Sequence, residues 1–152
     1  MPEITVVITT YNLEAYIGTC LEELFSGTYQ DFDVVLVDDG SKDQTVDIVE
    51  TYAQRYPGRI HPIFLQKNLG SPAKTRNWAL NSGFIDGKYV VFLDGDDSLE
   101  PEYLERLHML ALQSGADTVI CAYDRVEEKS SRVLCTEMQG FPQMISLPPK
   151  DD

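Results

Sequence analysis

The sequence predicts an α/β domain built on a central, mostly parallel β-sheet. Short β-branched runs alternate along the chain with segments of helical periodicity, which is the pattern of consecutive βαβ units. The chain has 152 residues, a length that suits one domain, and 43% of them are hydrophobic, enough to fill one core.

The first part of the chain contains two strand-like runs separated by a helical segment. Ile4–Thr9 is short and largely β-branched, as a strand buried in a parallel sheet is. Apolar residues then recur at helical spacing from Leu13 to Phe25, and Gly27 ends that helix. The second strand is Phe32–Val37.

The next two helices have recognisable start signals. Ser41 and Gln44 have the spacing of a capping box for a helix that continues to about residue 56. Ser71 is a suitable N-cap, with Pro72 at the first helical position, for a helix to about residue 82. The strands that follow these two helices are Ile60–Leu65 and Tyr89–Leu93.

The pattern weakens toward the end of the chain. We expect a helix over Pro101–Gln113 that Gly115 terminates, and a fifth strand over Thr118–Tyr123. Residues 127–132 are turn-like, Val133–Met138 is a further strand candidate, and residues 141–152 have no clear element. The sequence therefore predicts one domain over residues 1–125 and an incomplete region or tail over residues 126–152.

Aspartates are concentrated where two predicted strands end. Asp38 and Asp39 follow one strand, and Asp94, Asp96 and Asp97 follow another. Carboxylates this close repel one another by about 1 kcal/mol per pair at ~4 Å in water, so a cation or a set of donors is expected there. Magnesium and manganese prefer such oxygen ligands, and open α/β sheets bind ligands at the carboxyl ends of their strands. The second cluster is therefore a predicted divalent-metal site, and an acidic turn that caps the next helix is the alternative.

Two further motifs supply polar, aromatic and cationic groups. Thr9 and Tyr11 stand at the end of the first strand, where a tyrosine ring can lie against a nucleobase and a hydroxyl can bond its edge. Asp39 can accept a hydrogen bond from a base or a ribose. Lys74 and Arg76 lie near a helix start, which favours anions, and arginine can bind a phosphate with two hydrogen bonds. The alternatives are ordinary strand–helix turns and solvated charges on a helix surface.

The composition excludes several classes of partner. A net charge of −13 argues against nucleic acid and against polybasic binding to an anionic membrane. Cys20, Cys121 and Cys135 have no metal-ligand spacing and are expected to be reduced thiols of a cytoplasmic protein. No apolar stretch approaches the ~20 residues of a membrane span, and the N-terminus lacks the features of a signal peptide.

Four stretches, taken together, resemble the family 2 glycosyltransferases of GT-A fold. They are Thr9-Thr10-Tyr11-Asn12, Val37-Asp38-Asp39-Gly40-Ser41, Asn68-Leu69-Gly70 leading to Arg76-Asn77, and Phe92-Leu93-Asp94-Gly95-Asp96-Asp97. They occur in the order of the family and near its usual spacing, over about residues 4–123. The resemblance implies a GT-A (Rossmann-like) α/β/α sandwich and a nucleotide-sugar donor, commonly a UDP-sugar.

The resemblance also implies roles for individual residues. The residues that would bind the nucleotide sugar are Thr9, Tyr11, Asp39, Lys74, Arg76 and Asp94. The metal, manganese or magnesium, would be held by Asp96 with Asp97 as its neighbour. Asp94 and Asp96 would form the D-x-D motif of the family. The segment from Asn68 to Arg76 is one residue longer than the usual pattern, which bears on the roles of Lys74 and Arg76.

The implied reaction is a metal-dependent, inverting transfer of a sugar to a carbohydrate or lipid-linked acceptor. No catalytic base is assigned, because Glu127, Glu128 and Glu137 lack the local context that the family gives its base. We therefore expect the donor-binding portion of a longer enzyme, with residues 126–152 at the start of its acceptor side. The full-length enzyme is expected to be cytoplasmic or peripheral to the membrane.

Two alternatives remain open from the sequence. One is a truncated, non-catalytic nucleotide-binding fragment. The other is a phosphoacceptor receiver module, a signalling domain that is also small, acidic and built of βα units. In receivers the acidic pair follows the first strand, whereas here it follows the second.

Overall fold

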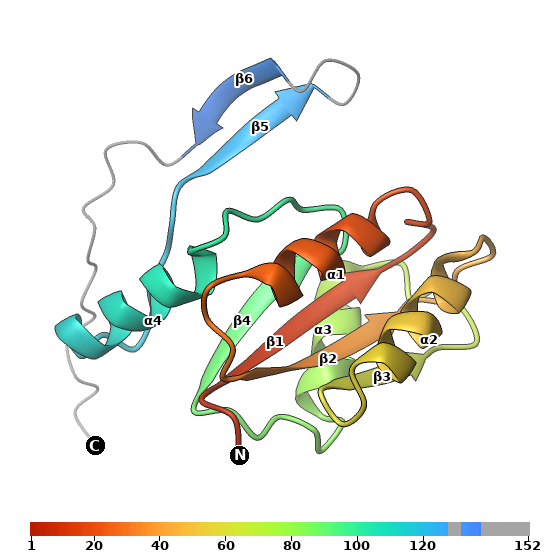
Figure 1. The fold of residues 1–152 in the computed structure, drawn as a ribbon. Coiled ribbons are helices and arrows are strands. Elements are labelled where there is room, and N and C mark those ends of the chain that lie inside the picture. The colour runs from red at the N-terminus through yellow and green to blue at the C-terminus, as the bar shows by residue number, and fades with distance from the viewer. Residues whose placement is uncertain (128–131, 138–152) are drawn as a thin grey trace. The chain divides into compact units, whose positions relative to one another are not determined.

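The computed structural model describes residues 1–127 and 132–137, which form alternating strands and helices (Figure 1). Their order is β1 (Ile4–Thr10), α1 (Ile17–Ser26), β2 (Phe32–Asp38), α2 (Thr45–Arg55), β3 (Ile60–Phe64), α3 (Pro72–Leu80), β4 (Tyr89–Asp94), α4 (Tyr103–Ser114), β5 (Tyr123–Glu127) and β6 (Arg132–Glu137). The chain divides into two compact units, residues 1–101 and a second unit that begins at Glu102.

The first unit is built on a parallel four-stranded sheet in the order β3-β2-β1-β4. Every residue of β1 and β2 is buried, because these central strands are covered on both faces. Their β-branched composition suits such positions. The structure confirms the predicted α/β class with a central parallel sheet.

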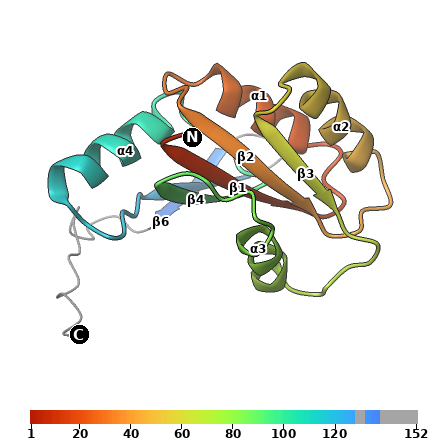
Figure 2. The same ribbon diagram turned by 90° about the horizontal axis from the view of Figure 1, so that it is seen from below.

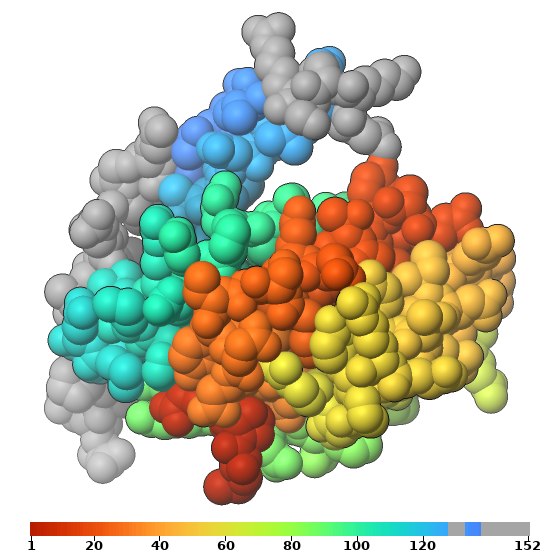
Figure 3. Space-filling model, viewed as in Figure 1, coloured from red at the N-terminus to blue at the C-terminus, as the bar shows by residue number. Residues whose placement is uncertain are grey.

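Helices lie on both faces of this sheet. Figure 2 shows α1 and α2 on one face and α3 on the other. In the space-filling view the side chains of α1 and α2 close over their face (Figure 3). On the opposite face, Val7, Val35 and Val37 pack with Ala79 of α3 to form a buried cluster. Strand residues alternate between the two faces, so one short run of valines and isoleucines supplies both layers of the core.

The register of the sheet brings the polar strand ends together. Thr9 of β1 lies opposite Asp94 of β4, and Thr10 lies opposite Asp38 of β2. Asp38 in turn pairs with Phe64 of β3. Because all four strands are parallel, the motifs that follow β1, β2 and β4 meet at one edge of the sheet.

The first helix begins later than its periodicity predicts. Apolar spacing starts at Leu13, but α1 starts at Ile17. The N–H of Leu13 donates to Thr45 Oγ1 at 2.8 Å and the N–H of Glu14 donates to Asp43 Oδ2 at 3.1 Å. The Leu13 carbonyl oxygen accepts from the N–H groups of Tyr16 and Ile17, so residues 13–16 form a turn that leads into α1 and is tied to the start of α2.

The capping box predicted for α2 is wrong. The helix starts at Thr45, so Gln44 occupies the N-cap position and Ser41 lies outside the helix. Ser41 is used within the preceding loop. By contrast, α3 begins at Pro72 with Ser71 at the N-cap position as predicted, although no side-chain cap hydrogen bond forms there.

The second unit contains α4 and an antiparallel hairpin of β5 and β6. Gly115 adopts a left-handed conformation with φ of 63° and terminates α4, as predicted. The strand predicted over Thr118–Tyr123 is wrong, since the strand spans Tyr123–Glu127. Antiparallel pairing with β6 sets its position, and the short apolar run that precedes it has no partner strand among the described residues.

Several predictions fall partly or wholly outside the described residues. These include the tail over 141–152, Glu128 and the centre of the predicted turn over 127–132. The predicted strand Val133–Met138 is confirmed as β6 through Glu137. The predicted boundary at residue 125 stays a prediction. No helix among the described residues has the length and apolar character needed to cross a membrane.

Candidate functional site

The loops that follow β1 and β2 are tied to each other by reciprocal hydrogen bonds. The N–H of Asn12 donates to Ser41 Oγ at 2.8 Å, and the N–H of Lys42 donates to Asn12 Oδ1 at 2.8 Å. Gln44 donates its N–H to the carboxylate of Glu14 at 2.9 Å. Asn12 has a φ of 53°, a left-handed conformation that asparagine tolerates better than most residues. This network fixes the first two polar motifs side by side.

Asp38 organises the loop after β2 from within. It is 1% exposed, and its carboxylate accepts from Thr10 Oγ1 at 2.9 Å and from the N–H groups of Gly40 and Ser41 at 3.1 and 2.9 Å. The Ser41 hydroxyl is a further donor. The role of Asp38 and Thr10 was missed from the sequence. The signal was available, because an aspartate before Gly-Ser commonly accepts hydrogen bonds from the backbone of its own turn.

Asp39 joins this loop to the one before α3. It is 6% exposed, its N–H donates to the Thr10 carbonyl oxygen at 2.8 Å, and its Oδ1 accepts the N–H of Leu69 at 2.8 Å. One carboxylate oxygen of Asp39 is thereby positioned by the backbone. The stretch that contains Leu69 is thus brought beside the β2 end, which explains why a motif so distant in sequence belongs to the same site.

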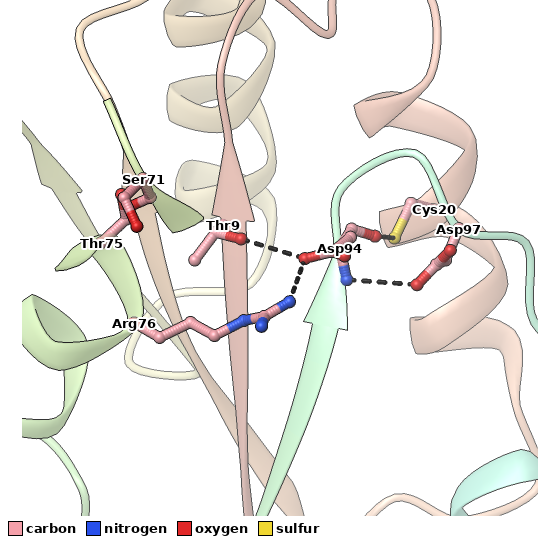
Figure 4. A network of polar contacts seen from close by, with 7 residues as sticks. All are labelled: Thr9, Cys20, Ser71, Thr75, Arg76, Asp94 and Asp97. Carbon is pink, nitrogen blue, oxygen red and sulfur yellow. Dashed lines mark hydrogen bonds and ion pairs between the residues drawn. The ribbon is translucent and has the colours of Figure 1, made fainter. Parts of the chain in front are cut away.

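Asp94 is the centre of a polar network at the end of β4 (Figure 4). Its Oδ1 accepts from Thr9 Oγ1 at 3.2 Å and from Arg76 Nη2 at 2.7 Å. Arg76 reaches from α3 to this oxygen, and its guanidinium carbon lies 6.0 Å from the centre of the Phe92 ring. Its Nε is buried and has no hydrogen-bond partner among the described residues. The structure therefore assembles three predicted site residues, Thr9, Arg76 and Asp94, from three different elements.

The acidic turn after β4 is held close to β1. The N–H of Gly95 donates to the Thr9 carbonyl oxygen at 3.0 Å, and a Cβ at Gly95 would lie 2.9 Å from the Thr10 methyl group. A larger residue at this position would have to displace the Thr10 side chain. Beneath the turn, the thiol of Cys20 donates weakly to the Asp94 carbonyl oxygen at 3.8 Å.

The carboxylates of this turn are crowded. Asp96 is exposed, and Asp97 Oδ2 accepts the N–H of Asp94 at 3.2 Å. Partial burial raises the pKa of the Asp97 carboxyl, and the charges of Asp94 and Asp96 raise it further. Burial is the largest cause of this rise in pKa, and a cation bound beside Asp97 would favour the ionised form of its carboxyl.

The remaining predicted residues occupy the rim of the site. Tyr11 is 45% exposed directly after β1, so its ring is accessible. Lys74 is exposed on α3, and its ammonium donates to the Leu69 carbonyl oxygen at 3.4 Å. The structure does not bring Lys74 into the hydrogen-bond network of Asp94.

The donor set suits a cation that is shared with a bound molecule. Within residues 1–127 and 132–137, no group of three or more histidine, cysteine, aspartate or glutamate side chains could hold a metal. Asp96 and Asp97 nevertheless offer oxygen donors of the kind that magnesium and manganese bind. Such ions commonly take one or two carboxylates and complete their shell with water and substrate phosphates.

Comparison with known proteins gives a consistent result. The sequence model described as glycosyl transferase family 2 matches residues 5–137. The cholesterol galactosyltransferase of Borreliella burgdorferi is 33% identical over 120 residues, which are 79% of this chain and 32% of that protein. The chain spans between 17% and 40% of the length of the first curated relatives that it matches.

Two solved structures share the fold. Staphylococcus aureus TarS 1–349 in complex with UDP-GlcNAc is 36% identical with a TM-score of 0.68, covering 76% of this chain and 32% of that one. The mannosyltransferase PcManGT of Pyrobaculum calidifontis, in complex with GDP-Man and Mn²⁺, is 27% identical with a TM-score of 0.65. That alignment covers 83% of this chain and 36% of that one.

Proposed function

Because the chain belongs to glycosyl transferase family 2, we propose that it is the donor-binding part of an enzyme that transfers a sugar from a nucleotide diphosphate. The observation that carries the proposal is the network in which Thr9, Arg76 and Asp94 meet at the carboxyl edge of the parallel sheet. The TarS complex with UDP-GlcNAc supports a UDP-sugar as the donor. Membership of this family also argues against the alternative of a receiver module.

The nucleoside end of the donor is assigned to the loops after β1 and β2. The exposed ring of Tyr11 offers a flat apolar face, and Thr9 offers a hydroxyl nearby. One carboxylate oxygen of Asp39 accepts a hydrogen bond from the Leu69 N–H. This contact orients the other oxygen as an acceptor for a base imide or a ribose hydroxyl. Because the reciprocal loop contacts fix both segments, these groups need little reorganisation when the base arrives.

The diphosphate end is assigned to Arg76, Asp94, Asp96 and Asp97. A divalent metal, Mn²⁺ or Mg²⁺, is proposed at Asp96 with Asp97 beside it, and when bound it would act as a Lewis acid for the departing diphosphate. The relative PcManGT is described with Mn²⁺. Arg76 supplies a fixed cation beside Asp94, and its charge would attract the diphosphate. Lys74 is retained as a weaker candidate at the rim.

The proposed transfer is inverting, with the sugar carbon attacked from the face opposite the diphosphate. A general base must come within hydrogen-bond reach of the attacking hydroxyl, and no described residue is assigned that role. The acceptor is proposed to be a carbohydrate or a lipid-linked molecule, and the name of the Borreliella relative supports the lipid option. A cytoplasmic or membrane-peripheral location stays a prediction.

Calorimetric titration of UDP into this chain, with and without Mn²⁺, tests the proposal. We expect binding that strengthens with the metal, and weaker binding of GDP. Asp96→Asn should remove the effect of the metal with the fold intact, whereas Asp39→Ala should weaken UDP in both conditions. Asp86→Asn is the matched control, because it removes an exposed carboxylate that precedes β4, whereas Asp94 stands at the other end of that strand. A folded sample that binds UDP in neither condition would refute the donor site.

A further inference from the structure

One side of α3 borders a hollow that contains none of the residues of the Asp94 network, although Lys74 is also the rim candidate of the donor site. It has a volume of about 420 Å³ and is lined by Leu69, Lys74, Asn77, Trp78 and Asn81. The last four residues follow the spacing i, i+3, i+4, i+7, so they share one side of the helix. The hollow is largely open to solvent, so it would contact one side of a bound ring.

Trp78 is a large aromatic residue that is not buried in the core. The buried residues Thr75 and Ala79 attach α3 to the sheet, whereas Trp78, on the flank of the helix beside them, is 51% exposed. Figure 2 shows α3 as the one helix of the first unit on its face of the sheet. Residues 1–101 are all described, so no other helix of this unit covers the indole. A large aromatic surface that stays in contact with water is available to a ligand.

We propose that this hollow binds the ring of a neutral sugar. A pyranose presents a face of C–H groups and a rim of hydroxyls, and the indole of Trp78 offers a flat apolar surface for that face. The carboxamides of Asn77 and Asn81 can both donate to and accept from hydroxyls, and the Lys74 ammonium can donate. Asn81 already donates its Nδ2 to the Asn77 carbonyl oxygen at 2.7 Å, so its amide is held in place.

The charge of the hollow disfavours a cation, and its position suits a glycan that takes part in sugar transfer. None of the lining residues is acidic, although the chain has a net charge of −13. The hollow also adjoins the donor site, because the Leu69 N–H bonds to Asp39 and Arg76 reaches Asp94 from the same helix. A glycan held on α3 would therefore lie beside the transfer site. The assignment of this glycan as part of the acceptor rests on the proposed function, whereas the binding of a sugar in the hollow does not.

The fluorescence of Trp78 reports directly on this site, since it is the only tryptophan of the chain. We would titrate the protein with maltotriose, cellotriose and chitotriose while following the emission maximum and the quenching by acrylamide. We expect at least one trisaccharide to shift the emission to shorter wavelength and to protect Trp78 from acrylamide in a saturable manner. No change with any of the three would overturn the proposal.

Calorimetry on variants separates this site from the donor site. Trp78→Ala should weaken trisaccharide binding at least about tenfold, and Trp78→Phe should restore part of it. Leu80→Ala, an exposed apolar residue of the same helix outside the hollow, should leave it unchanged. Each variant should bind UDP like the parent chain, so failure of one site is distinguishable from failure of the other. If Trp78 is instead protected by raising the protein concentration without sugar, the hollow is a protein interface and the proposal is wrong.

Discussion

Arg76 brings a positive charge into the polar network of Asp94. The side chain of Arg76 projects from α3, and its Nη2 lies 2.7 Å from Asp94 Oδ1. Both partners are partly exposed, so the ion pair itself adds little to the stability of the fold. Its value lies in a positive charge held where a diphosphate would accumulate negative charge.

Removal of this cation should affect binding more than folding. Arg76→Ala is expected to weaken UDP by about tenfold to a hundredfold, the range for a lost hydrogen bond to a charged group. Calorimetry gives the affinity, and thermal unfolding should show only a small change in Tm. Lys88→Ala removes a cation paired with Glu3 before β4, away from the site, and serves as the control. Equal affinities for the Arg76 variant and the control would contradict the assignment.

Cys20 makes the free energy of unfolding depend on pH in the alkaline range. Burial raises the pKa of its thiol from 9.0 to about 12, and the charges of Asp97 and Glu23 add to the rise. The unfolded chain therefore loses this proton above pH 9 while the folded chain keeps it. Stability from this group is fully present below pH 9 and is lost as the pH rises toward about 12.

Urea unfolding at several pH values tests this linkage. The free energy of unfolding should fall as the pH rises above 9. Cys20 should account for at most about 1.4 kcal/mol of this fall per pH unit. Cys20→Ala should be less stable at neutral pH but should show a shallower alkaline decline. Thr19→Ala, an exposed neighbour on α1, should keep the parent slope. Identical slopes for the parent and Cys20→Ala would refute the linkage.

At the scale of elements, the strands that carry the site were predictable and the loops between them were not. The β-branched runs Ile4–Thr9 and Phe32–Val37 identified β1 and β2 to within one residue, because a strand buried on both faces has a nearly continuous apolar sequence. The grouping of Thr9, Asp39 and Asp94 followed from parallel strands meeting at one edge. The outward placement of Lys74 could not be predicted from the sequence, because it depends on which side of α3 faces the sheet.

Misplaced helix starts have a common physical cause. The apolar spacing from Leu13 onward describes which side chains are buried, but the backbone N–H groups at positions 13 and 14 are bound by Thr45 and Asp43 of another loop. Likewise Ser41 serves Asp38 and Asn12 instead of capping α2. The contacts of Asn12, Leu13 and Glu14 join residues about 30 positions apart, which local sequence patterns do not record, whereas the contact of Ser41 with Asp38 is local.

The turn after β2 provides a prediction at this scale. Gly40 has a φ of 77°, and a Cβ there would lie 2.9 Å from the backbone of Lys67. Gly58 has a φ of 76° but has nothing within 4 Å of such a Cβ. Both alanine variants bear the cost of a left-handed conformation, about 1 kcal/mol or more, and only Gly40→Ala adds a backbone clash.

Gly40→Ala should therefore be less stable than Gly58→Ala by at least about 1 kcal/mol, measured by urea unfolding. It should also weaken UDP, since Lys67 precedes the stretch that Asp39 holds by the Leu69 N–H. Gly58→Ala should bind UDP normally. Equal stabilities would show that the Lys67 backbone moves aside at no cost.

At the scale of the whole molecule, the dominant property is excess negative charge. The chain has 25 acidic and 12 basic residues, and the ion pairs among the described residues are solvent-exposed to a large degree. Such pairs contribute little, so they do not offset the repulsion of a net charge of −13. Part of this repulsion lies in the acidic turn after β4, where the proposed divalent cation would reduce it.

Salt should therefore stabilise this protein instead of weakening it. The Debye length falls from about 10 Å at 0.1 M to about 3 Å at 1 M, which screens repulsion between distant carboxylates. We expect Tm to rise by roughly 2–4 °C between these KCl concentrations, equivalent to about 1 kcal/mol. A variant that combines Glu50→Gln, Asp86→Asn and Glu100→Gln, all exposed positions, should start from a higher Tm and respond less to KCl. A fall in Tm with added salt, or an equal response in the variant, would mean that local ion pairs outweigh the net charge.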